Sequence, residues 1–228
     1  SLCDWSSDVC SSDLYNSDLD AEVLHKVQLQ VGYADEVSNE TYLGITDQDF
    51  EASPTRRYAS TNQGEMSWWR TQLQLRYSVA ADTIDVSATA YRHDFGRIWT
   101  KLNRFADGTS LYDVLQSPGG ANAVYYAQLV GSEESTVPLM LGTNDRRFVS
   151  QGVAVRARWR PDFLGLSQEF DMGLRLHYDR IERRHSEAAV SLVERTLQPT
   201  TVAEGVAETV RNDDSALALA LHLQDELQ

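Results

Sequence analysis

The chain of 228 residues lacks several features, and each absence excludes a class of protein. It has no run close to the roughly 20 apolar residues of a membrane-spanning helix, which excludes a helical membrane protein. With 5 prolines and 13 glycines it is neither collagen-like nor a low-complexity repeat. Lys and Arg total 20 against 34 Asp and Glu, and the resulting net charge of −14 argues against binding to nucleic acid.

The residues that are present narrow the choice further. Apolar residues make up 42% of the chain, with 10 Tyr and 5 Trp, which is too rich for a disordered chain. A soluble fold and a β-barrel both remain, because barrel strands alternate apolar with polar residues and so do not form long apolar runs.

Both cysteines lie within the first 14 residues, at Cys3 and Cys10. In a secreted protein this spacing could form a small disulfide loop. Residues 3–14, however, resemble the translation of a common short-read sequencing adapter. We therefore treat residues 1–14 as an artefact outside the fold and residues 15–228 as the authentic segment, which we expect to be part of a longer protein. That segment has no cysteine, so cysteine usage does not indicate a redox compartment.

Six segments alternate apolar with polar residues. This is the main sequence sign of a β-strand, because successive side chains of a strand point to opposite faces. The segments are 26–33, 69–79, 84–91, 153–160, 170–179 and 216–223. An ordinary half-buried antiparallel sheet would give the same alternation.

The spacing of aromatic residues favours a membrane barrel over a soluble sheet. Trp69 and Tyr77 are eight residues apart on one apolar face, and Phe170 and Tyr178 repeat the spacing. Eight residues rise about 26 Å along a strand, or about 20 Å after a ~40° tilt. That height is close to the roughly 25 Å lipid-facing band of outer-membrane barrels, which aromatic girdles bracket.

Short and long connections alternate along the chain. The turns 80–83 and 161–167 are short, and we expect a further turn near Asn16–Asp20. Such alternation is typical of outer-membrane barrels, with short periplasmic turns and long extracellular loops. The expected long loops are 36–66, 100–146 and 185–212.

The longest loop contains two candidate helices. Ser110 precedes the helix-like residues 111–115, and residues 121–130 follow a Pro-Gly-Gly turn. An irregular loop is the alternative for both segments.

Several stretches resemble TonB-dependent outer-membrane receptors, specifically the ferric-citrate-receptor-like branch. They are SNETYLGITD (38–47), RRYAS (56–60), AYRHDFGR (90–97), the Trp99–Asn103 stretch, SLYDVL (110–115) and RRFVSQG (146–152). The resemblance touches most of residues 24–225.

The resemblance implies a fold, a location and partners. The fold would be an all-β antiparallel transmembrane barrel of about 22 strands with an N-terminal plug, of which this chain would hold about six strands and neither plug nor last strand. The location would be the outer membrane of a Gram-negative bacterium, in contact with its lipid. A TonB-type energy-coupling protein would drive uptake of a ferric siderophore or ferric citrate. The iron would arrive already chelated, so no cofactor is expected.

Arginines are the candidate substrate-binding residues. Cations outnumber carboxylates on the expected lumen face, and a cationic interior attracts anions. The resemblance implies substrate-binding roles for Arg97 and Arg146 near strand–loop junctions, with Arg147 beside Arg146 and Arg211 as a weaker candidate. Pairing with plug or neighbouring-strand carboxylates is the alternative.

For two further arginines, Arg158 and Arg160, we favour that structural pairing. No metalloprotease, thiol–disulfide or serine-hydrolase motif is present, so we expect no enzymatic activity. A soluble all-β surface or adhesin-type binding module remains the second reading of the sequence.

Overall fold

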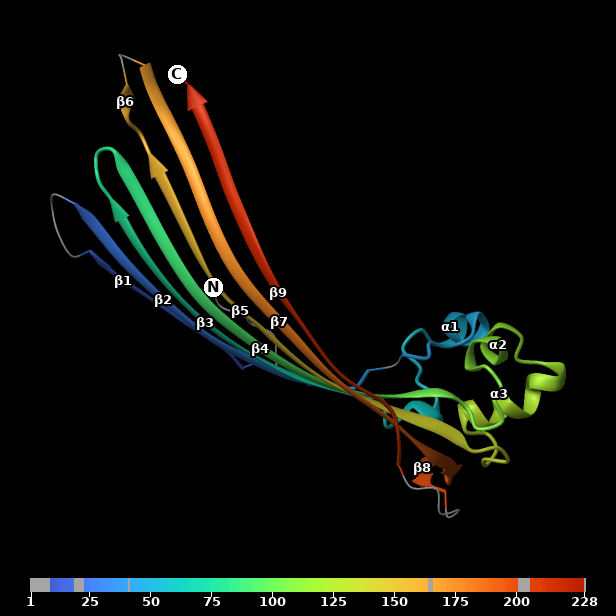
Figure 1. Cartoon of the computed structure of the whole chain (residues 1–228). Helices are drawn as coiled ribbons and strands as arrows, with labels where there is room; N and C mark the ends of the chain where they lie inside the picture. Colours follow the sequence, from blue (N-terminus) through green and yellow to red (C-terminus); the bar gives the residue numbers. More distant parts are fainter. Residues whose placement is uncertain (1–8, 19–22, 41, 164–165, 201–205, 228) are drawn as a thin grey trace.

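The chain forms one antiparallel sheet with a cluster of short helices at one end (Figure 1). The computed structural model describes residues 9–18, 23–40, 42–163, 166–200 and 206–227. The long strands are β1 (Val9–Asp18), β2 (Leu24–Ser38), β3 (Glu65–Ala80), β4 (Ile84–Phe105), β5 (Leu139–Trp159), β7 (Leu166–Val193) and β9 (Ala207–Leu227). Two short strands, β6 (Asp162–Phe163) and β8 (Thr196–Pro199), pair with β7.

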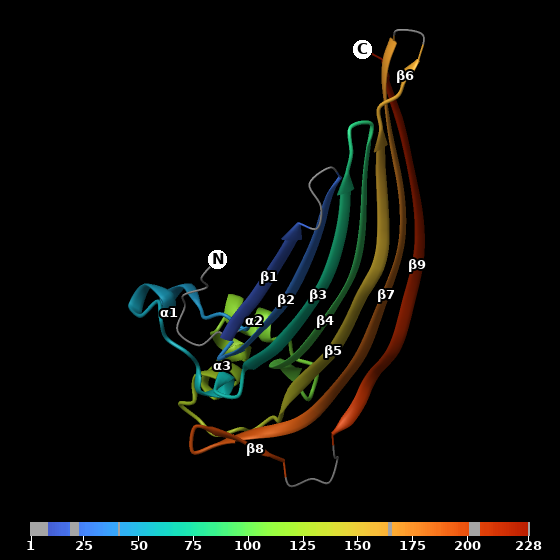
Figure 2. The same ribbon diagram turned by 90° about the vertical axis from the view of Figure 1, so that its left-hand side faces the viewer.

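The sheet is open. Its long strands lie side by side in the order β1, β2, β3, β4, β5, β7 and β9 (Figure 2). Among the described residues β1 pairs only with β2, and β9 only with β7, so these two strands are the edges. The predicted all-β antiparallel sheet is therefore confirmed, but the described strands do not close into a barrel.

All six predicted strands are present in the predicted order, but the predicted loop boundaries are wrong. β4 continues to Phe105 and β5 begins at Leu139, so the connection between them is residues 106–138 and is shorter than the predicted loop 100–146. Likewise β7 extends to Val193 and β9 begins at Ala207, inside the predicted loop 185–212. Where the extensions begin, both faces carry polar residues, as at Thr100 and Lys101, so the alternation ends although backbone pairing continues to the buried core residues Phe105 and Leu139.

The N-terminal prediction also needs correction. Asn16–Asp18, predicted as part of a turn, belong to β1, while residues 19–22 lie outside the described residues. β1 includes residues 9–14 of the adapter-like segment and pairs with β2 from Val9↔Asp35 to Asp18↔Lys26. A sheet edge offers backbone donors and acceptors to any proline-free segment. The pairing therefore carries no information about the origin of residues 9–14.

Both predicted helices are confirmed. In α2 (Leu111–Gln116) the Ser110 hydroxyl oxygen accepts a hydrogen bond from the backbone N–H of Asp113 and so caps the helix. α3 (Ala123–Val130) ends at Gly131, whose φ of 81° suits the left-handed position after a helix. The structure adds α1 (Asp47–Ala52) and two 3-10 turns, η1 (Ala59–Thr61) and η2 (Gly120–Asn122). No helix in the described ranges is long and apolar enough to cross a bilayer.

The buried hydrophobic core lies at the helical end. It joins the far ends of the long strands to the helices and consists of Tyr58, Leu102, Phe105, Leu111, Val114, Leu129, Leu139, Val190, Leu192 and Leu197. Asp49 sits beside it and accepts hydrogen bonds from Tyr58 at 2.6 Å and Tyr126 at 2.5 Å. Burial opposes ionisation, but these hydroxyls and the nearby Arg56 lower the pKa of Asp49. Asp49 is therefore ionised, and its carboxylate links the segment that carries α1 to α3 through the hydrogen bond from Tyr126.

Replacing Leu129 tests this core. Leu129 is fully buried, so Leu129→Ala should destabilise the helical cluster by roughly 2–5 kcal/mol through lost contacts and a residual cavity. Amide hydrogen exchange in α2 and α3 measures the change. Val124→Ala, at a site 41% exposed on the same helix, is the matched control. Equal effects of the two substitutions would contradict the assigned core.

Candidate functional site

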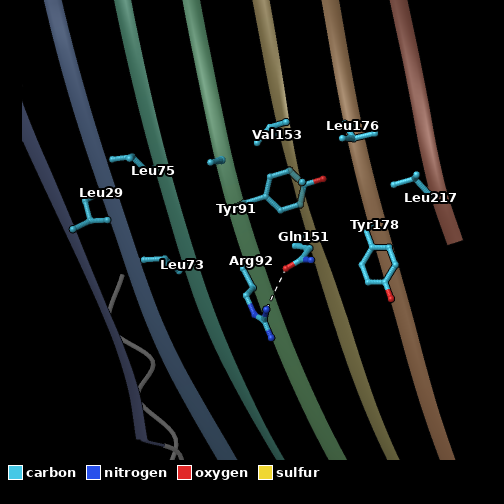
Figure 3. Close-up of a pocket in the computed structure, with 12 residues that line it drawn as sticks. Leu29, Leu73, Leu75, Tyr91, Arg92, Gln151, Val153, Leu176, Tyr178 and Leu217 are labelled. Carbon is cyan, nitrogen blue, oxygen red and sulfur yellow. Dashed lines mark hydrogen bonds between the residues drawn. The ribbon is translucent and has the colours of Figure 1, made fainter. Parts of the chain in front are cut away.

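The register gives the sheet an apolar face. One row of cross-strand partners crosses six strands and consists of Leu29, Leu75, Ala90, Val153, Leu176 and Leu219. The next row consists of Val27, Tyr77, Ala88, Val155, Leu174 and Leu221. We call the side that carries these rows the apolar face; Figure 3 shows part of it. Side chains of the intervening residues form the opposite, polar face.

No described residue covers the apolar face as a second layer. Leu29 is 38% exposed, Leu174 47% and Leu221 80%. At one end of the face the rings of Trp159 and Phe170 stack with centroids 5.7 Å apart. Tyr178 lies eight residues farther along β7 than Phe170, toward the other end of the face. The face is thus a continuous exposed apolar surface with aromatic residues toward both ends, and exposed patches of this kind mark interaction surfaces.

Ion pairs occupy the part of the polar face nearest the turns. Arg158 lies 3.0 Å from Glu169, and Arg160 pairs with Asp85 and Glu169. These contacts confirm the structural role favoured for the two arginines. Arg156 likewise pairs with Asp171, at 2.5 Å.

A cluster of three arginines lies farther along the polar face. Arg97, Arg146 and Arg183 are cross-strand partners on β4, β5 and β7. Ion pairs recorded among the described residues include none of the three. The Nε atoms of Arg97 and Arg183 are buried without a hydrogen-bond acceptor. Donors in this state are costly unless another group accepts from them.

The next row places polar and aromatic groups beside the arginines. His185, Asn144 and Trp99 are cross-strand partners there. Arg146 Nε lies 3.4 Å from Nε2 of His185. The indole Nε1 of Trp99 is another buried donor without an acceptor. Residues of both rows line a polar hollow that also includes Lys101, Thr209 and Glu187, while Arg183 lies beside it in the register and is not part of its lining. The Glu187 carboxylate is already paired with Arg104 and accepts a hydrogen bond from Asn103.

Mutual repulsion governs the electrostatics of the hollow. Burial, together with Arg97 and Arg183, lowers the pKa of Arg146. Burial also lowers the pKa of His185, and the three arginines lower it further. His185 is therefore neutral near pH 7 and can accept a hydrogen bond from Arg146. Uncompensated guanidinium groups of this kind bind carboxylates or phosphates, often through two parallel hydrogen bonds.

The four predicted substrate arginines separate onto two faces. Arg97 and Arg146 are brought together as direct cross-strand partners on the polar face. Arg147 pairs with Gly96 and Glu182 in the register and therefore lies on the opposite side of the sheet. Arg211 also lies on that side, across from Arg184. The structure thus does not place Arg147 and Arg211 in the hollow.

Sequence reasoning missed Arg183 and His185 as members of this cluster. Both continue the alternation that begins with Arg175, His177 and Asp179 on the polar face. Extending the same alternation along the strand past Tyr178, the last residue of the apolar stretch, predicts both residues on the polar face.

No group of three or more potential metal ligands is present in the described ranges. Comparison of the chain with models of known protein families, with curated proteins and with solved structures finds no match. The resemblance to TonB-dependent receptors stays a prediction.

The ionisation of His185 tests the cluster without any ligand. Arg146→Gln should raise the pKa of His185, because it removes a neighbouring positive charge. Citrate should raise it as well if the trianion occupies the hollow. NMR titration of the imidazole measures both shifts. Arg147→Gln, on the opposite face, is the control; if it raised the pKa of His185 as much as Arg146→Gln, the assigned geometry would be wrong.

Proposed function

We propose that this chain is part of an outer-membrane, TonB-dependent importer of an anionic ferric chelate, such as ferric citrate or a carboxylate siderophore. In this role the apolar face contacts lipid hydrocarbon and the polar face lines an aqueous lumen. The observation that carries the proposal is the uncovered apolar face backed by a face rich in arginine.

The open edges support a larger assembly of strands. With the adapter-like residues 9–14 of β1 set aside, the edges are β2 and β9; they leave backbone donors and acceptors unpaired, and each such group costs several kcal/mol in hydrocarbon. Additional strands that close the sheet would remove this cost. A barrel of about 22 strands with a plug is the closed form that we propose.

The arginine cluster supports an anionic cargo. Citrate and carboxylate siderophores present planar carboxylates, which the guanidinium fork matches in two parallel hydrogen bonds. Arg97, Arg146 and Arg183 would hold the carboxylates while the chelator itself holds the iron. Movement of the chelate inward would require energy from the periplasmic side, which a TonB-type partner would supply.

The soluble surface or adhesin-type module is the alternative. It would need a partner to cover the apolar face, whereas a bilayer covers that face along all six strands. The two readings differ in the behaviour of the purified protein. The importer needs detergent to stay monodisperse, and the soluble module does not.

Chelate binding tests the proposed cargo. In the whole protein that contains this chain, Arg97→Ala combined with Arg146→Ala should weaken binding of ferric citrate roughly 100-fold or more, since each charged hydrogen bond contributes about 1.5–3 kcal/mol. Quenching of tryptophan fluorescence measures binding. Trp99 is a suitable reporter because the guanidinium carbon of Arg97 lies 5.6 Å from its ring centroid.

Arg147→Ala combined with Arg184→Ala is the matched control. It removes two arginines from the opposite side of the sheet at nearly the same level, so chelate binding should be unchanged. Unaltered binding after removal of Arg97 and Arg146 would refute the assigned site.

A further inference from the structure

Tyr91, His177 and Asp179 form a hydrogen-bonded chain on the polar face. Tyr91 Oη lies 2.5 Å from Nδ1 of His177, and the other ring nitrogen, Nε2, lies 2.8 Å from the Asp179 carboxylate. Arg175 donates to the same hydroxyl oxygen, from Nη2 at 2.8 Å and from Nε at 3.2 Å. The four side chains come from β4 and β7 and are separate from the lining of the hollow.

Gly152 allows the ring of Tyr91 to reach β7. Gly152, on β5, is the cross-strand partner of both Tyr91 and His177, and the Tyr91 ring reaches from β4 over β5 (Figure 3). A Cβ atom on Gly152 would lie 2.7 Å from Tyr91 Oη, closer than such atoms approach one another in proteins. The contact between Tyr91 and His177 therefore depends on the absence of a side chain between them.

The chain of hydrogen bonds is open toward the space over the polar face. The side chain of His177 is 21% exposed and that of Asp179 is 55% exposed. The cross-strand partners of the β7 residues 175, 177 and 179 are all small: Ala154, Gly152 and Ser150 on β5, and Ala220, Ala218 and Ala216 on β9. A ligand on this face can therefore reach the Tyr91 hydroxyl and the His177 ring.

His177 and Asp179 have the arrangement of a metal-binding histidine and its supporting carboxylate. A histidine that coordinates a metal through one nitrogen commonly donates its other N–H to a carboxylate, which fixes the tautomer and the ring orientation. Because Asp179 can only accept, Nε2 of His177 carries the proton, and the lone pair of Nδ1 is directed at Tyr91 Oη. These two donor atoms need to separate by only roughly 0.4 Å to occupy adjacent positions on one ion with bonds of ~2.0–2.1 Å.

Arg175 selects the kind of metal complex that fits. Its guanidinium repels a free cation but attracts an ion that arrives with carboxylates of its own. Its two hydrogen bonds also stabilise negative charge on Tyr91 Oη. Tyrosine oxygen and histidine nitrogen both coordinate iron in proteins. Since the part of the chain that the structure describes has no group of three His, Cys, Asp or Glu ligands, a chelator has to fill the other positions.

We propose that Tyr91 and His177 coordinate the ferric ion of a carboxylate chelate, at a second site nearer the short turns than the hollow. Two water molecules leave the iron, Tyr91 Oη and His177 Nδ1 take their places, and the phenol proton passes to solvent. The iron stays ferric, the chelator keeps its other coordination positions, and Arg175 binds one of its free carboxylates. The identity of this cargo rests on the proposed function.

The second site is distinct from the hollow. Arg97 lies six residues beyond Tyr91 on the same face of β4, which is about 20 Å along the strand. The rings of Phe95 and Phe148, whose centroids are 5.6 Å apart, lie between the two levels. Binding at the two sites can therefore be measured separately.

Visible absorption of the whole protein that contains this chain tests the proposal, because tyrosinate bound to iron(III) gives a charge-transfer band. The probes are ferric citrate and ferric nitrilotriacetate. The native protein should show the band, and Tyr91→Phe should abolish it. Tyr77→Phe is the matched control and should retain it, because Tyr77 also contacts a histidine, Nδ1 of His25 at 2.7 Å, but lies on the apolar face.

Asp179→Asn tests the supporting carboxylate. It should weaken iron binding at this site roughly 10–100-fold, because the imidazole loses the partner that orients it. Titration of the band against free nitrilotriacetate measures the change. At saturating iron the band should return, since both ligands remain. An unchanged affinity would remove Asp179 from the site.

A band that survives Tyr91→Phe would overturn the proposal. So would ferric citrate binding without any band, which would leave the four side chains as a hydrogen-bond network only. Tryptophan quenching that depends on Arg97 and Arg146 reports the hollow independently and should be unchanged in Tyr91→Phe. Quenching without a band refutes only this inference, whereas a band without quenching supports this site and refutes the hollow. Absence of both signals refutes the proposed cargo as well.

Discussion

The uncovered apolar face is the constraint on which the rest of the structure depends. Its rows run unbroken across six strands, so no single strand can turn away from solvent without breaking the register of its neighbours. The helical cluster packs its own core at one end of the sheet and leaves these rows exposed. The hydrocarbon covering that we propose would satisfy the face along its whole width.

The same register organises the charges. Arg97 and Arg146, far apart in the chain, become direct partners because β4 and β5 pair continuously beyond the apolar rows. A difference of one residue places Arg147 on the other side. Strand alternation therefore separates the arginines into one group that faces the hollow and another that faces outward.

The sequence predicted the strands well, because alternation reports directly which face a residue occupies. The prediction failed where polar residues occupy both faces of a strand, because the alternation of apolar and polar residues then disappears. Between Arg180 and His185 polar residues dominate both faces, so the predicted strand ends at Asp179, before Arg183, whereas β7 continues to Val193. α2 and α3 were predictable from Ser110 and the Pro-Gly-Gly turn. The buried contact of Asp49 with Tyr58 and Tyr126 joins distant segments, and no local pattern encodes it.

Depth-dependent quenching of single labels on β7 tests the central claim most directly. Fluorophores attached at Leu174→Cys, Arg175→Cys and Leu176→Cys, in the protein that contains the cysteine-free residues 15–228, are compared in vesicles with brominated acyl chains. The account predicts strong quenching at positions 174 and 176 and weak quenching at 175, because adjacent side chains face opposite sides of the strand. Uniform quenching, or stronger quenching at 175, would show that the apolar face does not contact lipid.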